Sequence, residues 1–363
     1  MTERLLFTAT AAFESARRVD RLPEGHRARR VHGHSFLAQV RAAVPPTWAA
    51  PGAEATQVRD QLERCVQPLD YRLLNEHIEA PSDENLARWV KARLDVPGID
   101  QIGVRSAPHQ GVDLGRNGRC HIWRRYRFEA AHRLPNVAPG HKCGRMHGHG
   151  FEVVLHAEVD PNRRDPGADA DELDRCWLPL GTEFHQACLN DIPGLANPTS
   201  EMIASTIWER LSNSLPGLSW VTVHETATCG AHFDGQRYRI WTEVALDSAL
   251  SLKRVAAADP RRRIHGHTYG LRLHLSAPLD RILGWTVDFG DVKEAFTPIF
   301  LRLDHQPLYE LPGTEDNDVA SLARWIKAQI GSELPELSRI DLCETPGCGA
   351  IVAWGEGEPA LPV

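Results

Sequence analysis

The sequence has no long apolar run and no excess of basic residues. No stretch of 18 consecutive residues is apolar, so no membrane-spanning helix is expected. Lysine and arginine total 41 against 48 acidic residues, whereas a dedicated nucleic-acid-binding protein is normally basic. We therefore expect neither a membrane nor a nucleic acid as a partner.

Cysteine is also scarce. The eight cysteines include no Cys-x-x-Cys pair, and a disulfide scaffold would need a much larger fraction. We expect most of them to be reduced, buried thiols. The segment from Met1 to Leu5 lacks the layout of a signal peptide, so a cytoplasmic location is expected. At 363 residues, the chain is long enough for two or three domains.

Histidine, with 18 residues, is the abundant residue type, and its arrangement reveals a triplication. The tripeptide His-Gly-His occurs at 32–34, 147–149 and 265–267. Related segments precede each copy, at 13–17, 128–132 and 246–250, and related segments follow at 69–75, 184–190 and 303–309. A helical run follows as the fourth repeated segment in each case. Because these four segments recur in the same order, the sequence predicts three tandem units, at 1–118, 119–236 and 237–363.

Each unit has the same predicted secondary structure. Residues 151–159 and 271–275 alternate as strands do, and so does the segment before each His-Gly-His, which predicts an opening β-hairpin. Two helices follow; apolar residues at 322, 325, 326 and 330 have helical spacing. A closing hairpin ends the unit, and Pro- and Gly-rich joints near 108–118 and 234–237 mark the expected boundaries. The predicted fold class is α+β, with ββααββ units whose antiparallel sheet carries helices on one face.

Three histidines of the middle unit form a candidate metal site. His147 and His149 stand at i and i+2 on a predicted strand, so both side chains point to one face. His132 lies on the preceding strand, across the hairpin. Three imidazoles with a fourth position left for water or substrate are typical of a catalytic zinc site.

These residues resemble a known family. The run 128–134, Cys143 followed by His147-Gly148-His149, the segment 197–201 and the Glu225-Thr226 pair are similar to the pyruvoyl- and carboxy-tetrahydropterin synthases. The resemblance implies the tunnelling fold, in which three copies close into a twelve-stranded barrel with helices outside. It also implies Zn²⁺ bound by His132, His147 and His149.

The resemblance further implies roles for other residues. Cys143 would act in proton transfer with an Asp-His pair from a neighbouring subunit, and Glu225 would anchor the pterin ring. Cys143, near a cation and a histidine, is expected to have a depressed pKa. We also expect Thr199 and Arg133 to contact substrate. Arg133, Lys142 and Arg145 are candidates for holding a triphosphate, although an ordinary solvated basic surface is the alternative.

The three units have lost different parts of this machinery. The middle unit has His185-Gln186 where the family has Asp-His, whereas the third unit keeps Asp304-His305 but has Leu250 in the upstream histidine position. The first unit has Arg17, Tyr71 and Ser106-Ala107 at the corresponding positions. We hypothesise one active site per chain, at the seam between units two and three. His32, His34, His265 and His267 are not expected to bind metal, and Glu344 is expected to be a relic or structural.

The spacing between Cys143 and His147 resembles that of the bacterial carboxytetrahydropterin synthases, which make a precursor of 7-deazaguanine compounds such as queuosine. The expected reaction converts 7,8-dihydroneopterin triphosphate to 6-carboxytetrahydropterin, with release of acetaldehyde and triphosphate. Alternatives are pyruvoyltetrahydropterin or sepiapterin-type chemistry in the same pocket, or a non-catalytic pterin-binding scaffold. Because family rings pair face to face, a homodimer of two stacked rings is a further expectation.

Overall fold

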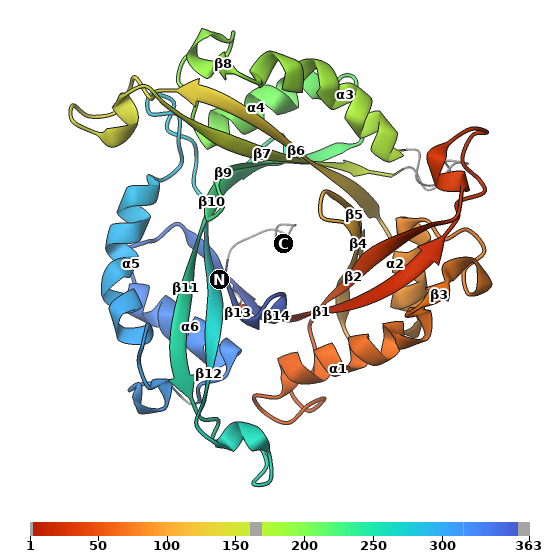
Figure 1. Ribbon diagram of the computed structural model, residues 1–363. Coiled ribbons are helices and arrows are strands. Elements are labelled where there is room, and N and C mark those ends of the chain that lie inside the picture. Colours follow the sequence, from red (N-terminus) through yellow and green to blue (C-terminus); the bar gives the residue numbers. More distant parts are fainter. Residues whose placement is uncertain (1–2, 160–168, 315, 355–363) are drawn as a thin grey trace.

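In the described part of the chain, twelve strands form a closed antiparallel barrel, and six helices cover its outer face (Figure 1). The computed structural model describes residues 3–159, 169–314 and 316–354. The barrel closes where β14 (Cys348–Ala353) pairs with β1 (Arg4–Arg17), in a register that runs from Arg4↔Ala353 to Thr8↔Gly349. The predicted α+β barrel of three fused units is therefore confirmed.

The three units repeat one order of barrel strands and helices, two strands, two helices and two strands, as the sequence predicts. In the first two units a two-residue strand, Arg72–Leu73 or Ala187–Cys188, also lies between the helices and pairs in parallel with the first strand of its unit. After β1, the first unit contains β2 (His32–Ala42), α1 (Glu54–Val66), β3 (Arg72–Leu73), α2 (Asp83–Arg93), β4 (Ile99–Ala107) and β5 (Gln110–Gly115). The second contains β6 (Cys120–His132), β7 (His147–Glu158), α3 (Asp169–Phe184), β8 (Ala187–Cys188), α4 (Ser200–Leu211), β9 (Leu218–Thr226) and β10 (Cys229–Phe233). The third contains β11 (Tyr238–Leu250), β12 (His265–Leu275), α5 (Phe289–Leu303), α6 (Val319–Ile330), β13 (Leu337–Thr345) and β14.

The hydrophobic core lies between the helices and the outer face of the barrel. In the second unit, Phe128 of β6 stacks on Phe151 of β7 with ring centroids 5.0 Å apart, and Phe184 of α3 meets Phe128 edge-on at 5.4 Å. Phe13 and Phe36 repeat this stack in the first unit, at 5.1 Å. Each fully buried ring contributes about 2–3 kcal/mol of hydrophobic stabilisation, and the repeated core holds each opening hairpin in the same position.

The units join strand to strand. The Gly-rich segment 108–118, expected near a unit boundary, contains β5, the last strand of the first unit, which pairs with β6 of the second unit from Gln110↔Arg124 to Leu114↔Cys120. A glycine is needed here for close packing of the two strands. A Cβ added to Gly111 would lie 2.6 Å from the ring of Trp123 on β6.

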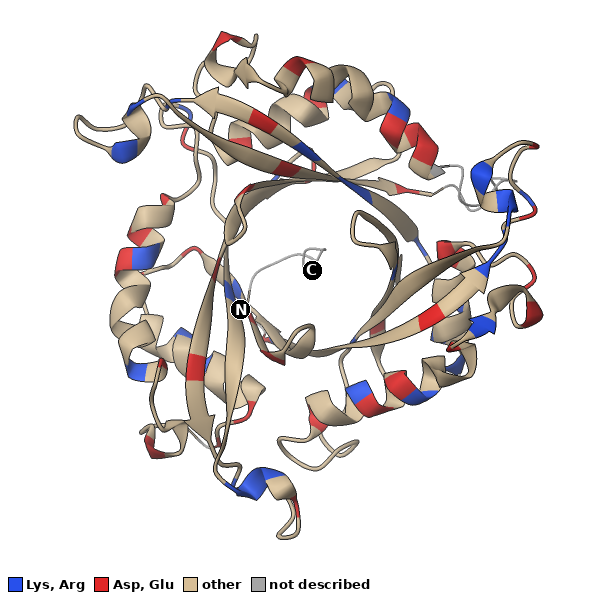
Figure 2. Ribbon diagram, in the orientation of Figure 1, with Lys and Arg blue, Asp and Glu red and all other residues tan. Residues whose placement is uncertain are grey.

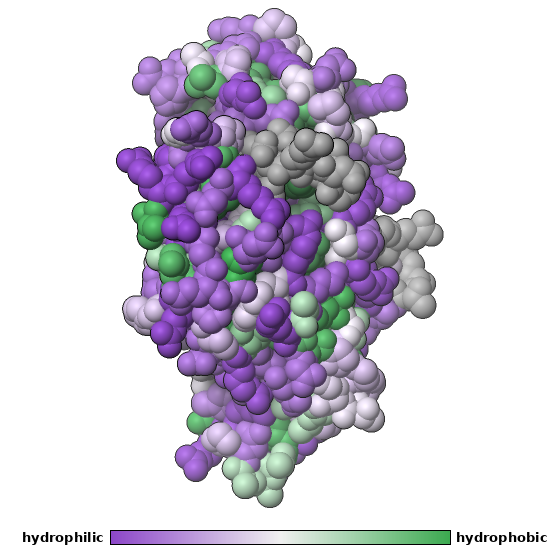
Figure 3. Space-filling model, turned by 90° about the vertical axis from the view of Figure 1, so that its right-hand side faces the viewer, coloured by the Kyte–Doolittle hydropathy of each residue, from purple (hydrophilic) through white to green (hydrophobic). Residues whose placement is uncertain are grey.

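The outer surface is mostly hydrophilic in side view (Figure 3). Three short loops project from the corners of the ring, and each contains a 3₁₀ helix: η1 (Arg27–Arg29), η4 (Lys142–Gly144) and η6 (Pro260–Arg262). All three carry basic residues (Figure 2). Within the described ranges, no helix has the length and apolarity needed to cross a membrane.

Candidate metal and pterin site

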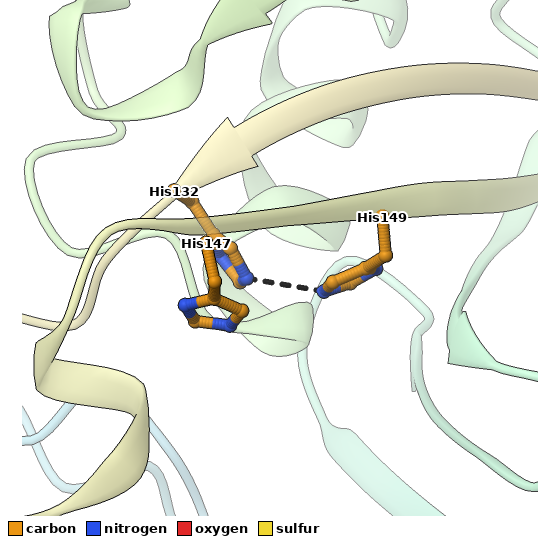
Figure 4. Close-up of side chains that lie close together, drawn as sticks. All are labelled: His132, His147 and His149. Carbon is orange, nitrogen blue, oxygen red and sulfur yellow. Dashed lines mark hydrogen bonds between the residues drawn. The ribbon is translucent and has the colours of Figure 1, made fainter.

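The three predicted histidines converge at one end of the second unit (Figure 4). The β6–β7 register places His132 directly opposite His147, and His149 follows on the same face of β7. The Nε2 atoms of His132 and His149 are 3.2 Å apart, and one ring nitrogen from each of the three residues lies within 4.8 Å of the others. His132 is buried, at 1% exposure, while His147 and His149 are half-buried.

Neighbouring carbonyl groups set the tautomers of two of these imidazoles. Nδ1 of His132 lies 3.0 Å from the carbonyl oxygen of Pro198, and Nδ1 of His147 lies 2.8 Å from that of Arg145. A carbonyl oxygen accepts, so each Nδ1 must carry the proton, which leaves the Nε2 lone pair free to bind a metal. Burial lowers the pKa of His132, which also favours the neutral imidazole that a metal needs.

The spacing fits a tetrahedral zinc ion. Zinc–nitrogen bonds of 2.0–2.1 Å in tetrahedral geometry place ligand nitrogens about 3.3 Å apart, close to the 3.2 Å between His132 and His149. Nδ1 of His149 is buried without a partner among the described residues. The donor set, three imidazoles, therefore fits a divalent metal and leaves one position open.

A carboxylate stands beside the histidines. Oε1 of Glu225, near the end of β9, is 4.0 Å from Nε2 of His149, and its Oε2 accepts a hydrogen bond of 2.7 Å from the buried hydroxyl of Ser200. Ser200 begins α4 directly after the N-cap residue Thr199. The helix start thus orients Glu225, a contact that the sequence did not predict.

Cys143 lies in η4, just before β7, and is half-buried. His141 forms the N-cap of this turn, with its Nδ1 accepting from the backbone N–H of Cys143 at 3.2 Å. Burial, followed by the negative charge of Glu225, raises the pKa of the Cys143 thiol, and Lys142 opposes this weakly. The expected depressed pKa is therefore wrong for the protein alone, because burial of the thiol, together with the nearby carboxylates, outweighs the nearby cation.

The loop that holds Cys143 rests on the third unit. The side-chain amide of Asn136 donates to the carbonyl oxygen of Ile282 at 2.6 Å, and Nε2 of His141 lies 3.7 Å from Oδ2 of Asp288. Buried Glu201 of α4 accepts from the backbone N–H of Thr286 at 2.8 Å. The candidate site therefore lies at the seam between units two and three, next to the N-cap of α5.

Asp304 and His305 lie at the other end of α5. Asp288 caps the N-terminus of this helix and Asp304 its C-terminus, and 15 residues at 1.5 Å each separate them by about 22 Å. His305 occupies a shallow groove with Ile264, His265 and His267 of its own unit. The hypothesis that this pair joins the histidines across the seam of one chain is not supported, because α5 holds the two groups apart.

The first and second units have grooves that correspond to the groove around His305, with the same backbone arrangement. His149 and Gln186 border the groove of the second unit, and His34 and Tyr71 that of the first. Tyr71, Gln186 and His305 all have positive φ, between 53° and 60°. In each, the backbone N–H donates to a strand carbonyl oxygen at 2.6 Å. This hydrogen bond holds a conformation that is unfavourable for a residue with a Cβ.

The first unit has a guanidinium where the second has a metal ligand. Arg17 pairs with His32 in the register that His132 makes with His147. Its Nη1 donates to the carbonyl oxygen of Pro81 at 3.0 Å and to Asp83 at 2.6 Å, and its Nη2 lies 3.3 Å from Nε2 of His34. Ser106 donates to the other oxygen of Asp83 at 2.6 Å. The first unit therefore has a carboxylate, Asp83, at the position of Ser200 and a hydroxyl, Ser106, at the position of Glu225, the reverse of the second unit.

In the third unit, an apolar residue stands where the second unit has His132. Leu250, which pairs with His265, is buried and apolar. Nδ1 of His265 still bonds to the carbonyl oxygen of Arg263 at 2.7 Å, as in the other units. Burial raises the pKa of Glu344, and Arg261 opposes this shift. Among the described residues, two groups could hold a metal: the three histidines of the second unit, and the more exposed set of Asp247, Asp304 and His305 in the third unit, which offers a single imidazole.

Thr199 and Arg133, both expected to contact substrate, differ in their exposure to solvent. The hydroxyl of Thr199 is buried; it accepts from the backbone N–H of Met202 and donates to the carbonyl oxygen of Gly284. Its hydrogen bonds are therefore used to hold the seam. The side chain of Arg133 is exposed, while its backbone is held by Asn190 at 2.9 Å. Lys142 and Arg145 are exposed on the same loop.

Comparisons with known proteins agree with a chain built of three repeated units. The model of the family described as 6-pyruvoyl tetrahydropterin synthase matches three times, at residues 7–106, 121–236 and 239–354. A 6-carboxy-5,6,7,8-tetrahydropterin synthase of Synechocystis is 35% identical over 123 residues, which are 32% of this chain and 94% of the relative. A dihydroneopterin monophosphate aldolase of Pyrococcus furiosus is 27% identical over 122 residues, 32% of this chain and 97% of the relative.

Among solved structures, the 6-pyruvoyl tetrahydropterin synthase of Caenorhabditis elegans is 18% identical with a TM-score of 0.30, covering 32% of this chain and 95% of its own. The family model matches most of the chain. The chain therefore belongs to the 6-pyruvoyl tetrahydropterin synthase family, with three copies of the family unit in one polypeptide.

Proposed function

We propose that this protein is a zinc-dependent lyase that converts 7,8-dihydroneopterin triphosphate to 6-carboxytetrahydropterin, acetaldehyde and triphosphate. The observation that carries the proposal is the convergence of His132, His147 and His149 beside Glu225 and Cys143. The Synechocystis relative, a 6-carboxy-5,6,7,8-tetrahydropterin synthase by name, supports this chemistry over the pyruvoyl type. The Pyrococcus relative supports a carbon–carbon bond cleavage at a dihydroneopterin side chain.

The chain's own residues would bind and orient the substrate. Glu225, oriented by Ser200, would accept two hydrogen bonds from the amide and amino groups of the pterin ring. The exposed side chains of Arg133, Lys142 and Arg145 would bind the triphosphate. Zinc, when bound by the three imidazoles, supplies a Lewis acid for a substrate hydroxyl or carbonyl oxygen. Cys143 would transfer a proton as general base.

We further infer that Asp304 and His305 act on the histidine site of a second copy of the chain. The pair lies about 22 Å along α5 from the end that meets its own chain's Cys143 loop. The imidazole of His305 is 76% exposed, although its Nδ1 is held 2.8 Å from Asp304. Such a preoriented, exposed imidazole is well placed to enter the site of a neighbouring molecule.

The surface around His305 also favours a face-to-face dimer. Val31, Met146 and Ile264 each precede a His-Gly-His tripeptide and are exposed large apolar residues. Ile264 lies in the same groove as His305, and His149 borders the matching groove of the second unit. A two-fold axis that exchanges the second and third units would place His305 of each chain at the triad of its partner and complete two sites per dimer.

Product analysis tests the reaction. The metal-loaded protein is incubated with 7,8-dihydroneopterin triphosphate, and acetaldehyde, triphosphate and the pterin product are measured. We expect acetaldehyde and 6-carboxytetrahydropterin in equal amounts. Triphosphate release without acetaldehyde would instead indicate pyruvoyl-type chemistry. Binding without turnover, unaffected by Cys143→Ala or His305→Ala, would indicate a pterin-binding scaffold.

A further inference from the structure

A cavity of about 580 Å³ lies at the seam between the first and second units, beside Arg17. Sites for small molecules typically have volumes of about 300–1,000 Å³. The first unit lines the cavity with the end of β1, the η1 loop, the start of α2 and β5, and the second unit lines it with β6 and the start of α3. Arg124 of the lining is eight residues before His132 on β6, about 27 Å away along the strand. The cavity is therefore separate from the histidine site of the second unit.

Apolar side chains form most of its wall. Val19 and Leu22 follow β1, Val112 lies on β5 and Ile122 on β6, and all four are buried. The indole ring of Trp123 adds an aromatic surface. An apolar wall with an aromatic ring suits a ligand with a planar ring.

Arg17 brings an unused hydrogen-bond donor to this cavity. The residue is 5% exposed; its Nη1 donates to Pro81 and Asp83, and its Nη2 lies 3.3 Å from Nε2 of His34. Its Nε is buried and makes no hydrogen bond to the residues that the structure describes. A buried N–H group without an acceptor is costly. The cavity therefore calls for an acceptor atom at this position.

His32 brings an acceptor to the same part of the cavity. Its Nδ1 lies 2.7 Å from the carbonyl oxygen of Arg30, so Nδ1 carries the proton and Nε2 keeps a lone pair. The ring centroid of His32 is 5.0 Å from that of His34, which contacts Arg17. One donor and one acceptor on neighbouring side chains match the carbonyl oxygen and the N–H group of a heterocyclic ring.

Ion pairs balance the charges in the buried part of the lining. Arg17 is paired with Asp83 at 2.6 Å, and Arg124 with Asp174 at 2.7 Å. Glu84, at the start of α2, is a further buried carboxylate of the lining. This part of the cavity therefore suits a neutral ring rather than an anionic group.

Two exposed cations line the cavity on the η1 loop. Arg27 and Arg30 are both exposed, and neither forms an ion pair with a carboxylate of the described residues. The carboxylate of Asp171, on the second unit's side of the cavity, lies 2.9 Å from Nε2 of His26. Guanidinium groups bind phosphate well, through paired N–H donors. Arg27 and Arg30 therefore suit the phosphate groups of a ligand whose ring lies in the cavity.

The η1 loop corresponds to the η4 loop of the second unit. Arg27 and Arg30 stand at the positions of Lys142 and Arg145, whereas Ala28 stands at the position of Cys143. The first unit has thus kept the cations of the loop and lost the thiol. The significance of this comparison rests on the proposed function, but the cavity and its unused donor and acceptor do not.

We propose that the cavity is a second, metal-independent binding site, for a phosphorylated heterocycle whose ring carries a carbonyl oxygen. The ring would pack on the apolar wall, with its carbonyl oxygen accepting from Nε of Arg17. The phosphate groups would bind Arg27 and Arg30. Because Ala28 replaces the thiol and Arg17 a metal ligand, the site binds this ligand without changing it. A pterin triphosphate and guanosine triphosphate both have the required chemistry.

Equilibrium dialysis of the full chain in EDTA tests the proposal, with 7,8-dihydroneopterin triphosphate, guanosine triphosphate and inorganic triphosphate as the three probes. We expect at least one of the two ring compounds to bind, and the tighter of the two identifies the kind of ring. Inorganic triphosphate should bind at least tenfold more weakly than that compound. Glu225→Ala, which removes the carboxylate proposed to anchor a pterin in the second unit, should keep this binding.

Two changes to the η1 loop locate the binding. Arg27→Ala with Arg30→Ala should weaken it tenfold or more, and Ala28→Trp should weaken it similarly by filling the cavity. Arg18→Ala with Arg21→Ala is the matched control. It removes the same charge from the same connection between β1 and β2, but neither residue lines the cavity, so binding should be unchanged.

The proposal is overturned if neither ring compound binds the wild-type chain, or if inorganic triphosphate binds as tightly. Loss of binding in Glu225→Ala, or equal losses in the two double-arginine variants, would also overturn it. The comparison of probes on the wild-type chain does not depend on whether any variant folds. Because the measurement uses metal-free protein and no turnover, failure of this site and failure of the proposed reaction are distinguishable.

Discussion

Nδ1 of His305 lies 2.8 Å from Oδ2 of Asp304, and this pair caps the end of α5 that points away from the chain's own histidine triad. The carboxylate is itself fixed, since Oδ1 of Asp304 accepts from the backbone N–H of Asp247 at 3.0 Å. Both hydrogen bonds lie within the third unit, so the imidazole is oriented by its own unit. The Asp304-His305 pair is therefore held in a fixed orientation while its imidazole remains exposed.

Replacement of Asp304 by Asn should lower the pKa of His305. The hydrogen bond and charge of Asp304 raise this pKa in the wild-type protein, and they favour the protonated imidazole. The interaction is fully present below the ordinary histidine pKa and is lost as the pH rises through the raised value. An NMR titration of His305 in both proteins measures the difference. An unchanged pKa in Asp304→Asn would show that the carboxylate does not act on the imidazole.

The wild-type protein should bind about one metal ion per chain, because three imidazoles converge in one of its three units. His147→Ala should reduce binding by two orders of magnitude or more, measured by metal analysis after dialysis. His265→Ala is the matched control, since His265 has the same backbone contact but faces Leu250. Equal losses of metal in the two variants would contradict the assignment.

The first unit should gain a metal site when Arg17 and its partner are replaced. Arg17→His with Asp83→Ser restores the residue types of the second unit at these positions, and His32 and His34 are already in place. We expect metal binding to rise from about one to about two ions per chain. Arg17→Leu with Asp83→Ser is the control and should leave the count unchanged. A count that stays at one in the histidine variant would indicate that Arg17 is not the structural substitute for a metal ligand.

Ser200→Ala should weaken substrate binding and leave the metal in place. The hydroxyl of Ser200 orients Glu225 through a half-buried hydrogen bond of 2.7 Å, and loss of such a bond costs about 1 kcal/mol. If Glu225 anchors the pterin ring, KM should rise about fivefold. Steady-state kinetics and metal analysis on the same preparation check both parts. A fall in metal content would assign Ser200 to the histidine site instead.

The sequence predicts the hairpin-based part of the site well. Strand alternation and the spacing of His132, His147 and His149 predict that they share one face, and the register confirms it. The same comparison of the units identifies Asp304-His305 as a retained pair. The sequence does not tell which histidine site this pair can reach, because that depends on the length of α5 and on the order of the units around the ring.

The groups that shift the pKa of Cys143 could not be predicted from the sequence either. Cys143 has Lys142 beside it in the chain, which favours a low pKa. The residues that raise the pKa include Glu225 and Asp288, which approach it only in the folded barrel. His141 has a visible signal in retrospect, since His26 and Asp259 occupy the same N-cap position in the other two units.

The most direct test is whether two inactive variants restore activity to each other. Cys143→Ala and His305→Ala chains, carrying different tags, are coexpressed, and the mixed dimer is purified through both tags. If each site combines the triad of one chain with His305 of the other, the mixed dimer has one intact site and about half the wild-type turnover. Each variant alone should be inactive. A mixed dimer as inactive as either variant would show that both groups act within one chain, and would contradict the account.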